Sequence, residues 1–165
     1  MNAAAWLVDV GYVVKASEGL FRLDYLRAQQ VIAERCGPTR SLLFNGYDET
    51  YGIPAGLQAF YDEMKRQGMV VRLQPMDSGT VETNRQRRVD VDLGAHLVWQ
   101  ASLPDVETLV FTTGDQDLIP ALEVVRDRLH KRVVLFTYRR NVSHELVDLV
   151  DEWWLFEDED VRLAR

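Results

Sequence analysis

Aspartates stand at three places along this chain where they could carry out chemistry together. Asp9 closes an apolar run with the length of a strand, and Asp115 and Asp117 follow another such run. Asp90 lies between them in sequence, just after a cluster of arginines and at the start of a helical pattern. Hard divalent cations prefer carboxylate oxygens as ligands. If these acids converge in space, they would bind a divalent metal and support hydrolysis of phosphodiester bonds in nucleic acid.

Each of these acids also has a plainer explanation. Asp115 or Asp117 could cap the helix that is expected to begin near Leu118, because aspartate is a favoured N-cap residue. Asp9 could accept hydrogen bonds from loop amides, since a buried carboxylate is costly unless it is paired or coordinates a cation. Two acids after one strand, together with an acid at the end of another strand, favour metal binding over capping.

Asp90 and Asp92 cannot lie on the same face of a helix, because neighbours on a face are three or four residues apart. We expect Asp90 to point into the site and Asp92 to point outward or toward the helix cap. Gly94, one turn after Asp90, would allow a neighbouring segment to approach closely.

Three arginines, Arg85, Arg87 and Arg88, directly precede the central acids. Guanidinium groups pair with phosphates in a bidentate geometry, so these residues are candidates for substrate binding. A solvated run of charge is the usual alternative. The net charge of −7 makes a local basic cluster more informative here than it would be in a basic chain.

Other constellations are weaker. Ser143 and His144 lack a positioned third partner for a catalytic triad, and Ser143 is expected to N-cap a helix instead. Neither of the standard glycine-rich phosphate loops is present. The single cysteine, Cys36, excludes an intramolecular disulfide and a multi-cysteine zinc site, and is expected to be a packing residue.

Strand-like and helix-like patterns alternate along the whole chain. Strands are expected at residues 5–10, 41–45, 70–74, 108–112, 133–138 and 153–156, and helices at 23–36, 54–67, 89–100, 118–129 and 143–150. Most strand segments are near-continuous apolar runs, which is typical of parallel strands buried on both faces. The pattern predicts an α/β fold with right-handed crossovers, whose ligands bind at the carboxyl ends of the strands. Two polar stretches, 46–52 and 76–88, are expected to be loops that contact substrate.

The composition bounds the class of protein. A chain of 165 residues with 47% hydrophobic and 27% charged residues is expected to be one globular domain. The negative net charge argues against a general nucleic-acid coat protein but not against a nuclease. The acidic run 157–160 is expected to be a solvated end, and Trp153 and Trp154 could belong to the core or to a homodimer surface. No long apolar run or signal peptide is evident, so no membrane contact and a cytoplasmic location are expected.

Four segments in this order resemble the NYN domain family, a branch of the PIN-like nuclease superfamily that includes LabA-like proteins. The matching pieces are Leu7-Val8-Asp9-Val10-Gly11, Arg88-Val89-Asp90-Val91-Asp92-Leu93, Thr113-Gly114-Asp115-Gln116-Asp117-Leu118-Ile119-Pro120, and Ser143-His144-Glu145-Leu146 followed by Asp151. The family's usual wording for the third piece is Ser-Gly-Asp-Ser-Asp-Phe-x-Pro. The resemblance covers nearly the whole chain, and the Gly-Asp-x-Asp block is its most specific part.

The resemblance implies one NYN domain over residues 1–165, built as a three-layer α/β sandwich with a mainly parallel, Rossmann-like central sheet. It also implies Mg²⁺- or Mn²⁺-dependent cleavage of RNA by a water nucleophile. Single-stranded RNA is the expected partner, because aromatic side chains could stack on unpaired bases. Carried over by position, the catalytic and metal-binding acids would be Asp9, Asp90, Asp115 and Asp117. Substrate would be held by Arg85, Arg87, Arg88, Tyr12 and Asn45. Of the tyrosines, Tyr12, Tyr47 or Tyr51 could stack on unpaired bases.

The first motif departs from the family at one position. The family usually carries asparagine three residues after the first aspartate, where this chain has Tyr12. Asn45 could partly replace that asparagine. The alternative reading is a catalytically weak or inactive module that binds RNA or a protein partner. An aspartate-nucleophile phosphatase is disfavoured, because it needs a second aspartate at position 11, which is glycine.

Overall fold

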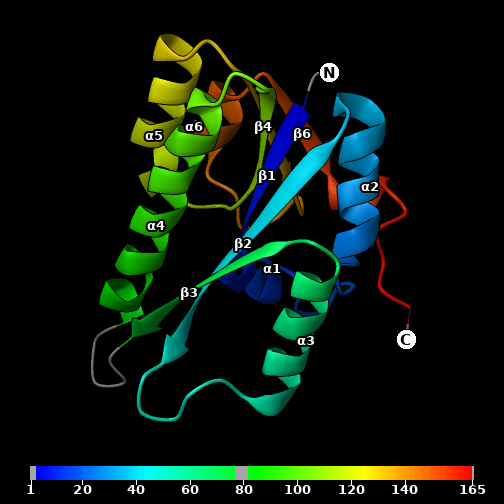
Figure 1. Ribbon diagram of the computed structural model, residues 1–165, viewed down its shortest axis with the longest axis vertical. Coiled ribbons are helices and arrows are strands. Elements are labelled where there is room, and N and C mark those ends of the chain that lie inside the picture. The colour runs from blue at the N-terminus through cyan, green and yellow to red at the C-terminus, as the bar shows by residue number, and fades with distance from the viewer. Residues whose placement is uncertain (1–2, 77–81, 165) are drawn as a thin grey trace.

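Six parallel strands form one sheet in the order β3-β2-β1-β4-β5-β6 (Figure 1). The structure is a computed structural model that describes residues 3–76 and 82–164. The strands are β1 (Ala3–Asp9), β2 (Thr39–Asp48), β3 (Val70–Met76), β4 (Val106–Thr112), β5 (Arg132–Thr137) and β6 (Glu152–Leu155). The chain runs outward from β1 to β3 and then returns to the other side of β1. The strand order therefore reverses between β1 and β4, the position where open α/β sheets form ligand sites.

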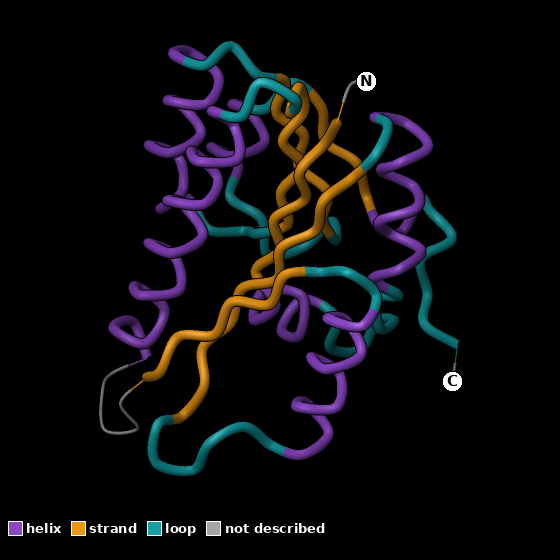
Figure 2. The backbone as a smooth tube through the Cα atoms, in the orientation of Figure 1, coloured by secondary structure: helices purple, strands orange, loops and turns teal. Residues whose placement is uncertain are grey.

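Helices cover both faces of this sheet, which gives three layers (Figure 2). They are α1 (Val10–Ala16), α2 (Tyr25–Cys36), α3 (Ala55–Arg66), α4 (Glu82–Ser102), α5 (Ile119–Glu123) and α6 (His144–Leu149), with short helical turns η1 (Gln116–Leu118), η2 (Val124–Arg128) and η3 (Phe156–Asp158). The α/β prediction is confirmed. No helix within the described ranges is long and apolar enough to cross a membrane.

The strands are apolar on both sides because each face buries a separate hydrophobic cluster. Trp6 and Val8 of β1 join the cluster under α1 and α2. Leu7, pointing the other way, joins the cluster with Leu93 of α4 and Leu122 of α5. Alternate residues of one strand thus supply two cores, as expected for a central parallel strand.

Two helical segments differ from the sequence prediction. Helix α1 was not expected, and it begins directly after Asp9. Helix α4 begins at Glu82, so the prediction of a loop over 76–88 is wrong for its second half, while residues 77–81 lie outside the described part. The first turns of α4 are polar and lack an apolar stripe, although glutamate, glutamine and arginine are good helix formers. Strand β2 likewise continues to Asp48, into the loop expected over 46–52.

The acidic run 157–160 is not simply a solvated end. Glu159 pairs with Arg35 of α2, and Asp160 lies 2.9 Å from the guanidinium of Arg27. The next residue, Val161, is fully buried, and its carbonyl accepts a hydrogen bond from the amide of Asp24. This segment therefore closes the outer side of α2.

Trp153 and Trp154 have partners within the chain, and both are half-buried. The Trp153 indole donates to Thr137 Oγ1 at 2.9 Å. The Trp154 ring packs edge-on against Phe136, and the Arg35 guanidinium lies 4.6 Å from its centroid. Internal packing is thus sufficient to explain this pair of tryptophans.

Candidate metal centre

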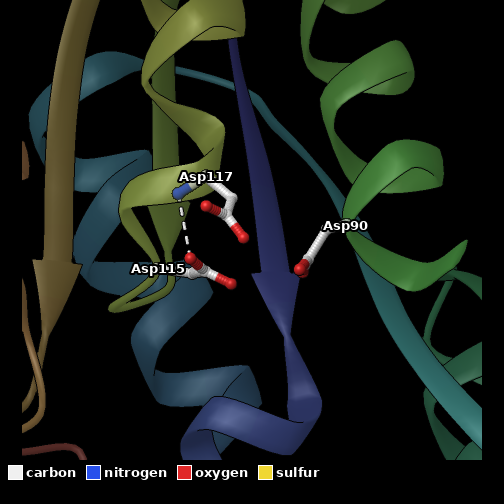
Figure 3. Close-up of side chains that lie close together, drawn as sticks. All are labelled: Asp90, Asp115 and Asp117. Carbon is white, nitrogen blue, oxygen red and sulfur yellow. Dashed lines mark hydrogen bonds between the residues drawn. The ribbon is translucent and has the colours of Figure 1, made fainter. Parts of the chain in front are cut away.

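Three of the four predicted acids converge at the carboxyl edge of the sheet. Carboxylate oxygens from Asp90, Asp115 and Asp117 all lie within 4.8 Å of one another. Asp90 projects from α4, while Asp115 and Asp117 come from the segment that follows β4 (Figure 3). Figure 3 shows the Asp90 carboxylate facing the other two from the opposite side. We call these three residues the acid cluster.

Asp115 caps a helical turn and also belongs to the acid cluster. Its Oδ1 accepts a hydrogen bond of 2.9 Å from the backbone amide of Asp117 and so caps η1. Its own amide donates to Thr113 Oγ1 at 3.2 Å. Capping and membership of the site were alternatives at the level of sequence. The structure satisfies both, since capping uses only one carboxylate oxygen.

Asp9 lies beside the acid cluster but is not part of it. Its Oδ1 accepts from the amide of Tyr12 at 3.1 Å and so caps α1. Its Oδ2 accepts from the Thr113 hydroxyl at 3.4 Å. Burial raises the pKa of Asp9 to about 6, with a smaller contribution from the charge of Asp115 and against the effect of these hydrogen bonds. Asp9 thus accepts a backbone hydrogen bond, from a helix amide rather than a loop amide, and coordination of a metal by Asp9 stays a prediction.

The surroundings of Asp90 strongly disfavour the charged form of its carboxyl group. Its pKa is raised to about 8, first by burial and then by a hydrogen bond with the Asp115 carboxyl and repulsion from the neighbouring acids. Carboxylates this close resist being charged together unless a cation offsets them. The donor atoms are oxygens only, which are the ligands that Mg²⁺ and Mn²⁺ prefer. The acid cluster therefore fits a divalent cation.

Asp92 lies away from the acid cluster, as the helix geometry predicts. The expectation that it points outward or toward the helix cap is wrong, because its side chain is only 10% exposed and faces β3. Asp92 accepts from Arg72 at 3.0 and 3.2 Å and from Gln74 at 3.2 Å, both on the edge strand β3. His96 Nδ1 lies 3.6 Å from Asp92, although burial lowers the pKa of that imidazole. This network fixes α4 against β3.

The loops after β4 and β5 touch at Gly114. A Cβ at this position would lie 1.7 Å from the carbonyl oxygen of Asn141, so the contact requires glycine. Gly94, in contrast, would place a Cβ at an ordinary 3.5 Å from Leu118, so the close approach expected there does not depend on glycine.

Tyr12 holds the same two loops together. Its ring lies 3.1 Å from the Cβ position of Gly114, and its hydroxyl is 3.0 Å from the Arg140 carbonyl and 3.3 Å from the Tyr138 carbonyl. Only 9% of Tyr12 is exposed. This packing favours a structural role over the expected stacking on bases.

The remaining predicted substrate residues are less well defined. Asn45, within β2, donates to the Tyr61 hydroxyl at 2.9 Å, and its Oδ1 lies 3.6 Å from the Cβ position of Gly11. Arg88 is exposed and donates to the Pro75 carbonyl at 3.1 Å. Arg85 and Arg87 belong to the first turns of α4, where the side chains are outside the described part of the structure.

Three residues near the acids were not among the predicted site residues. Lys15, Thr113 and Asn141 line a hollow of about 190 Å³ together with Asp9 and Asp115. Thr113 could have been found from its place two residues before Asp115. Lys15 could not, because its position depends on helix α1, which the apolar sequence after Asp9 concealed.

The parallel three-layer sandwich and the acid cluster at its carboxyl edge are those expected of a PIN-like nuclease domain. A sequence profile of the NYN domain matches residues 5–155, nearly the whole chain. The chain therefore belongs to the NYN domain family.

Comparisons with individual proteins add support for the fold alone. A search of curated proteins returned no match. The crystal structure of a protein of unknown function, VPA0982 from Vibrio parahaemolyticus RIMD 2210633, aligns with a TM-score of 0.79 and 22% identity, over 98% of this chain and 96% of that chain. The structure of LpCGTa in complex with UDP gives a TM-score of only 0.46 and 11% identity, over 90% of this chain and 32% of that one, and bears on no conclusion here.

Proposed function

We propose that this protein is a metal-dependent ribonuclease that hydrolyses phosphodiester bonds in single-stranded RNA. The observation that carries the proposal is the convergence of Asp90, Asp115 and Asp117 at the carboxyl edge of a NYN-family sheet. Repulsion within this group, which contributes to the raised pKa of Asp90, supports binding of a cation there.

Asp90, Asp115 and Asp117 would hold Mg²⁺ or Mn²⁺. A bound ion would supply a water nucleophile at neutral pH and offset negative charge at the scissile phosphate. The chain's own contribution is to fix the acids: the Asp117 amide orients Asp115, and Thr113 links Asp115 to Asp9. Asp9 adds a further negative charge behind the acid cluster, and we propose it as a fourth acid of the site.

An exposed tyrosine supports single-stranded RNA as the substrate class. Tyr51 is 85% exposed at the tip of an ordered loop. Asp48 Oδ1 accepts from the amides of Thr50 and Tyr51 at 2.8 and 3.1 Å, and Gly52 closes the turn with a φ of 73°. Unpaired bases stack on aromatic rings of this kind. We propose Tyr51, rather than Tyr12, as the stacking residue, and Arg88 as a contact for phosphate.

The proposal is tested by incubating end-labelled single-stranded RNA with Mn²⁺ or Mg²⁺, beside a reaction in EDTA. Asp115→Asn keeps an oxygen that can cap η1 but removes a charge from the acid cluster. Asp92→Asn is the matched control, since it removes a carboxylate on α4 that lies outside the cluster.

We expect RNA cleavage that requires metal. Its rate should fall by at least about a hundredfold in Asp115→Asn and stay near the wild-type rate in Asp92→Asn. RNA binding without cutting in either metal would contradict the proposal. That result would favour a module that binds RNA without cleaving it.

A further inference from the structure

One cation beside the acid cluster has no partner among the described residues. Lys15 lies in the last turn of α1 and is exposed. Several arginines elsewhere, including Arg72 and Arg132, are paired with carboxylates. Lys15 makes no such pair with the side chains that the structure describes, those of residues 3–76 and 88–164, although Asp9 and Asp115 line the same hollow. Its ammonium group is therefore available to a ligand.

The hollow around Lys15 has the features of a small anion site next to the acids. Its volume of about 190 Å³ is smaller than the roughly 300–1,000 Å³ of sites for drug-sized ligands, so it suits a compact group. Gly11, one turn before Lys15, also lines it and contributes no side chain to fill it. Asn141 closes the other side with a φ of 59°, held in place by its contact with Gly114.

We propose that this hollow binds a phosphate of the RNA chain adjacent to the scissile bond, with Lys15 as its cation and Asn141 as an amide donor. This inference rests on the proposed function and assigns a substrate subsite to it. Acids alone repel a polyanion, so a cation at the edge of the acid cluster would position the chain there. Lysine acts on phosphate as a point charge, and phosphate contacts fix register without reading the base.

The test is binding of fluorescently labelled oligouridine and oligoadenosine in EDTA, where no metal-dependent cutting occurs, over a series of salt concentrations. For Lys15→Gln we expect binding roughly tenfold weaker at low salt, equally for both sequences. The slope of log K against log salt should fall in magnitude by about 0.7, the value for one lost contact to a single strand. Lys15→Arg should keep most of the affinity.

Lys65→Gln is the matched control, because Lys65 is an exposed lysine in the last turn of α3 and the substitution makes the same change in net charge. The inference is overturned if Lys15→Gln binds RNA like the wild type or like Lys65→Gln, or if the wild type binds no RNA.

A separate readout distinguishes this inference from the proposed function. Lys15→Gln should keep the rise in melting temperature that Mn²⁺ gives the wild type, because Lys15 is not a candidate ligand. A wild type that binds RNA through Lys15 but never cuts it would overturn the ribonuclease and leave the phosphate subsite. If the wild type cuts RNA and Lys15→Gln binds RNA as well as the wild type does, the ribonuclease proposal stands and the phosphate subsite is overturned.

Discussion

At the scale of single residues, the acid cluster opposes folding when no cation is bound. Asp90 is half-buried and faces two other acids, which raises the pKa of its carboxyl to about 8. The charged form of Asp9 is disfavoured in the same way, mainly by burial. Such an arrangement destabilises the metal-free protein, and groups with strongly shifted pKa values are typical of functional sites.

Replacing Asp90 should therefore stabilise the metal-free protein. We expect Asp90→Asn to raise the free energy of unfolding in EDTA at pH 8 by about 1–2 kcal/mol, after allowing for solvent screening of a half-buried group. The same variant should lose the stabilisation that Mn²⁺ gives the wild type. Thermal unfolding with and without Mn²⁺ measures both effects. A less stable variant that still responds to Mn²⁺ would contradict the role of Asp90.

The pH dependence of stability follows from the same two groups. The folded protein favours the protonated forms of Asp9 and Asp90, so their contribution to stability is fully present below about pH 4 and is lost as pH rises through about 6 and 8. In EDTA, wild-type stability should thus fall relative to Asp90→Asn between about pH 4 and pH 8. With Mn²⁺ the difference should reverse, because binding requires deprotonated ligands. A constant difference across this range would count against the raised pKa of Asp90.

The acids were predictable from sequence because their positions relative to strand and helix ends are local properties. The separation of Asp90 from Asp92 followed from helix geometry alone, and the structure agrees. The position of Asp9 was harder to predict, since its capping bond and its separation from the acid cluster depend on α1 and Thr113. Lys15 and Asn141 depend on how two loops pack, which no local pattern encodes.

At the scale of elements, the acid cluster depends on the contact between the loops after β4 and β5. Gly114→Ala would drive a Cβ into the Asn141 carbonyl at 1.7 Å, and one loop would have to move. We expect a loss of about 2–4 kcal/mol in stability, together with weakened Mn²⁺ binding, because Asp115 directly follows. Chemical denaturation and calorimetric titration with Mn²⁺ measure these quantities.

Gly56→Ala serves as the control for that substitution. A Cβ at Gly56 in α3 meets nothing within 4 Å, so this change should be neutral or slightly stabilising. Equal effects of the two substitutions would show that the contact between the loops does not matter.

The sequence located the six strands because their apolar runs reflect burial on both faces. It missed α1 because this helix has only seven residues and begins at Val10 with no turn after β1. It also missed the start of α4, where polar residues form a helix with no apolar stripe to reveal it. In both cases the packing of neighbouring elements decides the structure more than the local pattern does.

At the scale of the whole molecule, the segment after β6 secures the side of the sheet that carries α2. Val161 is fully buried there, whereas Leu163 is 45% exposed. We expect Val161→Ala to lower the free energy of unfolding by about 1–3 kcal/mol and Leu163→Ala to change it by less than about 0.5 kcal/mol. Equilibrium denaturation compares the two, and a neutral Val161→Ala would mean that this segment is solvated, as its acidic sequence suggests.

The most direct test of the central claim is to locate Mn²⁺ by anomalous diffraction from crystals of the wild-type protein grown with the ion. We predict an anomalous peak bounded by the carboxylates of Asp90, Asp115 and Asp117, and loss of that peak in Asp90→Asn. A peak elsewhere, or none between these three acids at saturating Mn²⁺, would contradict the metal centre and the ribonuclease proposed from it.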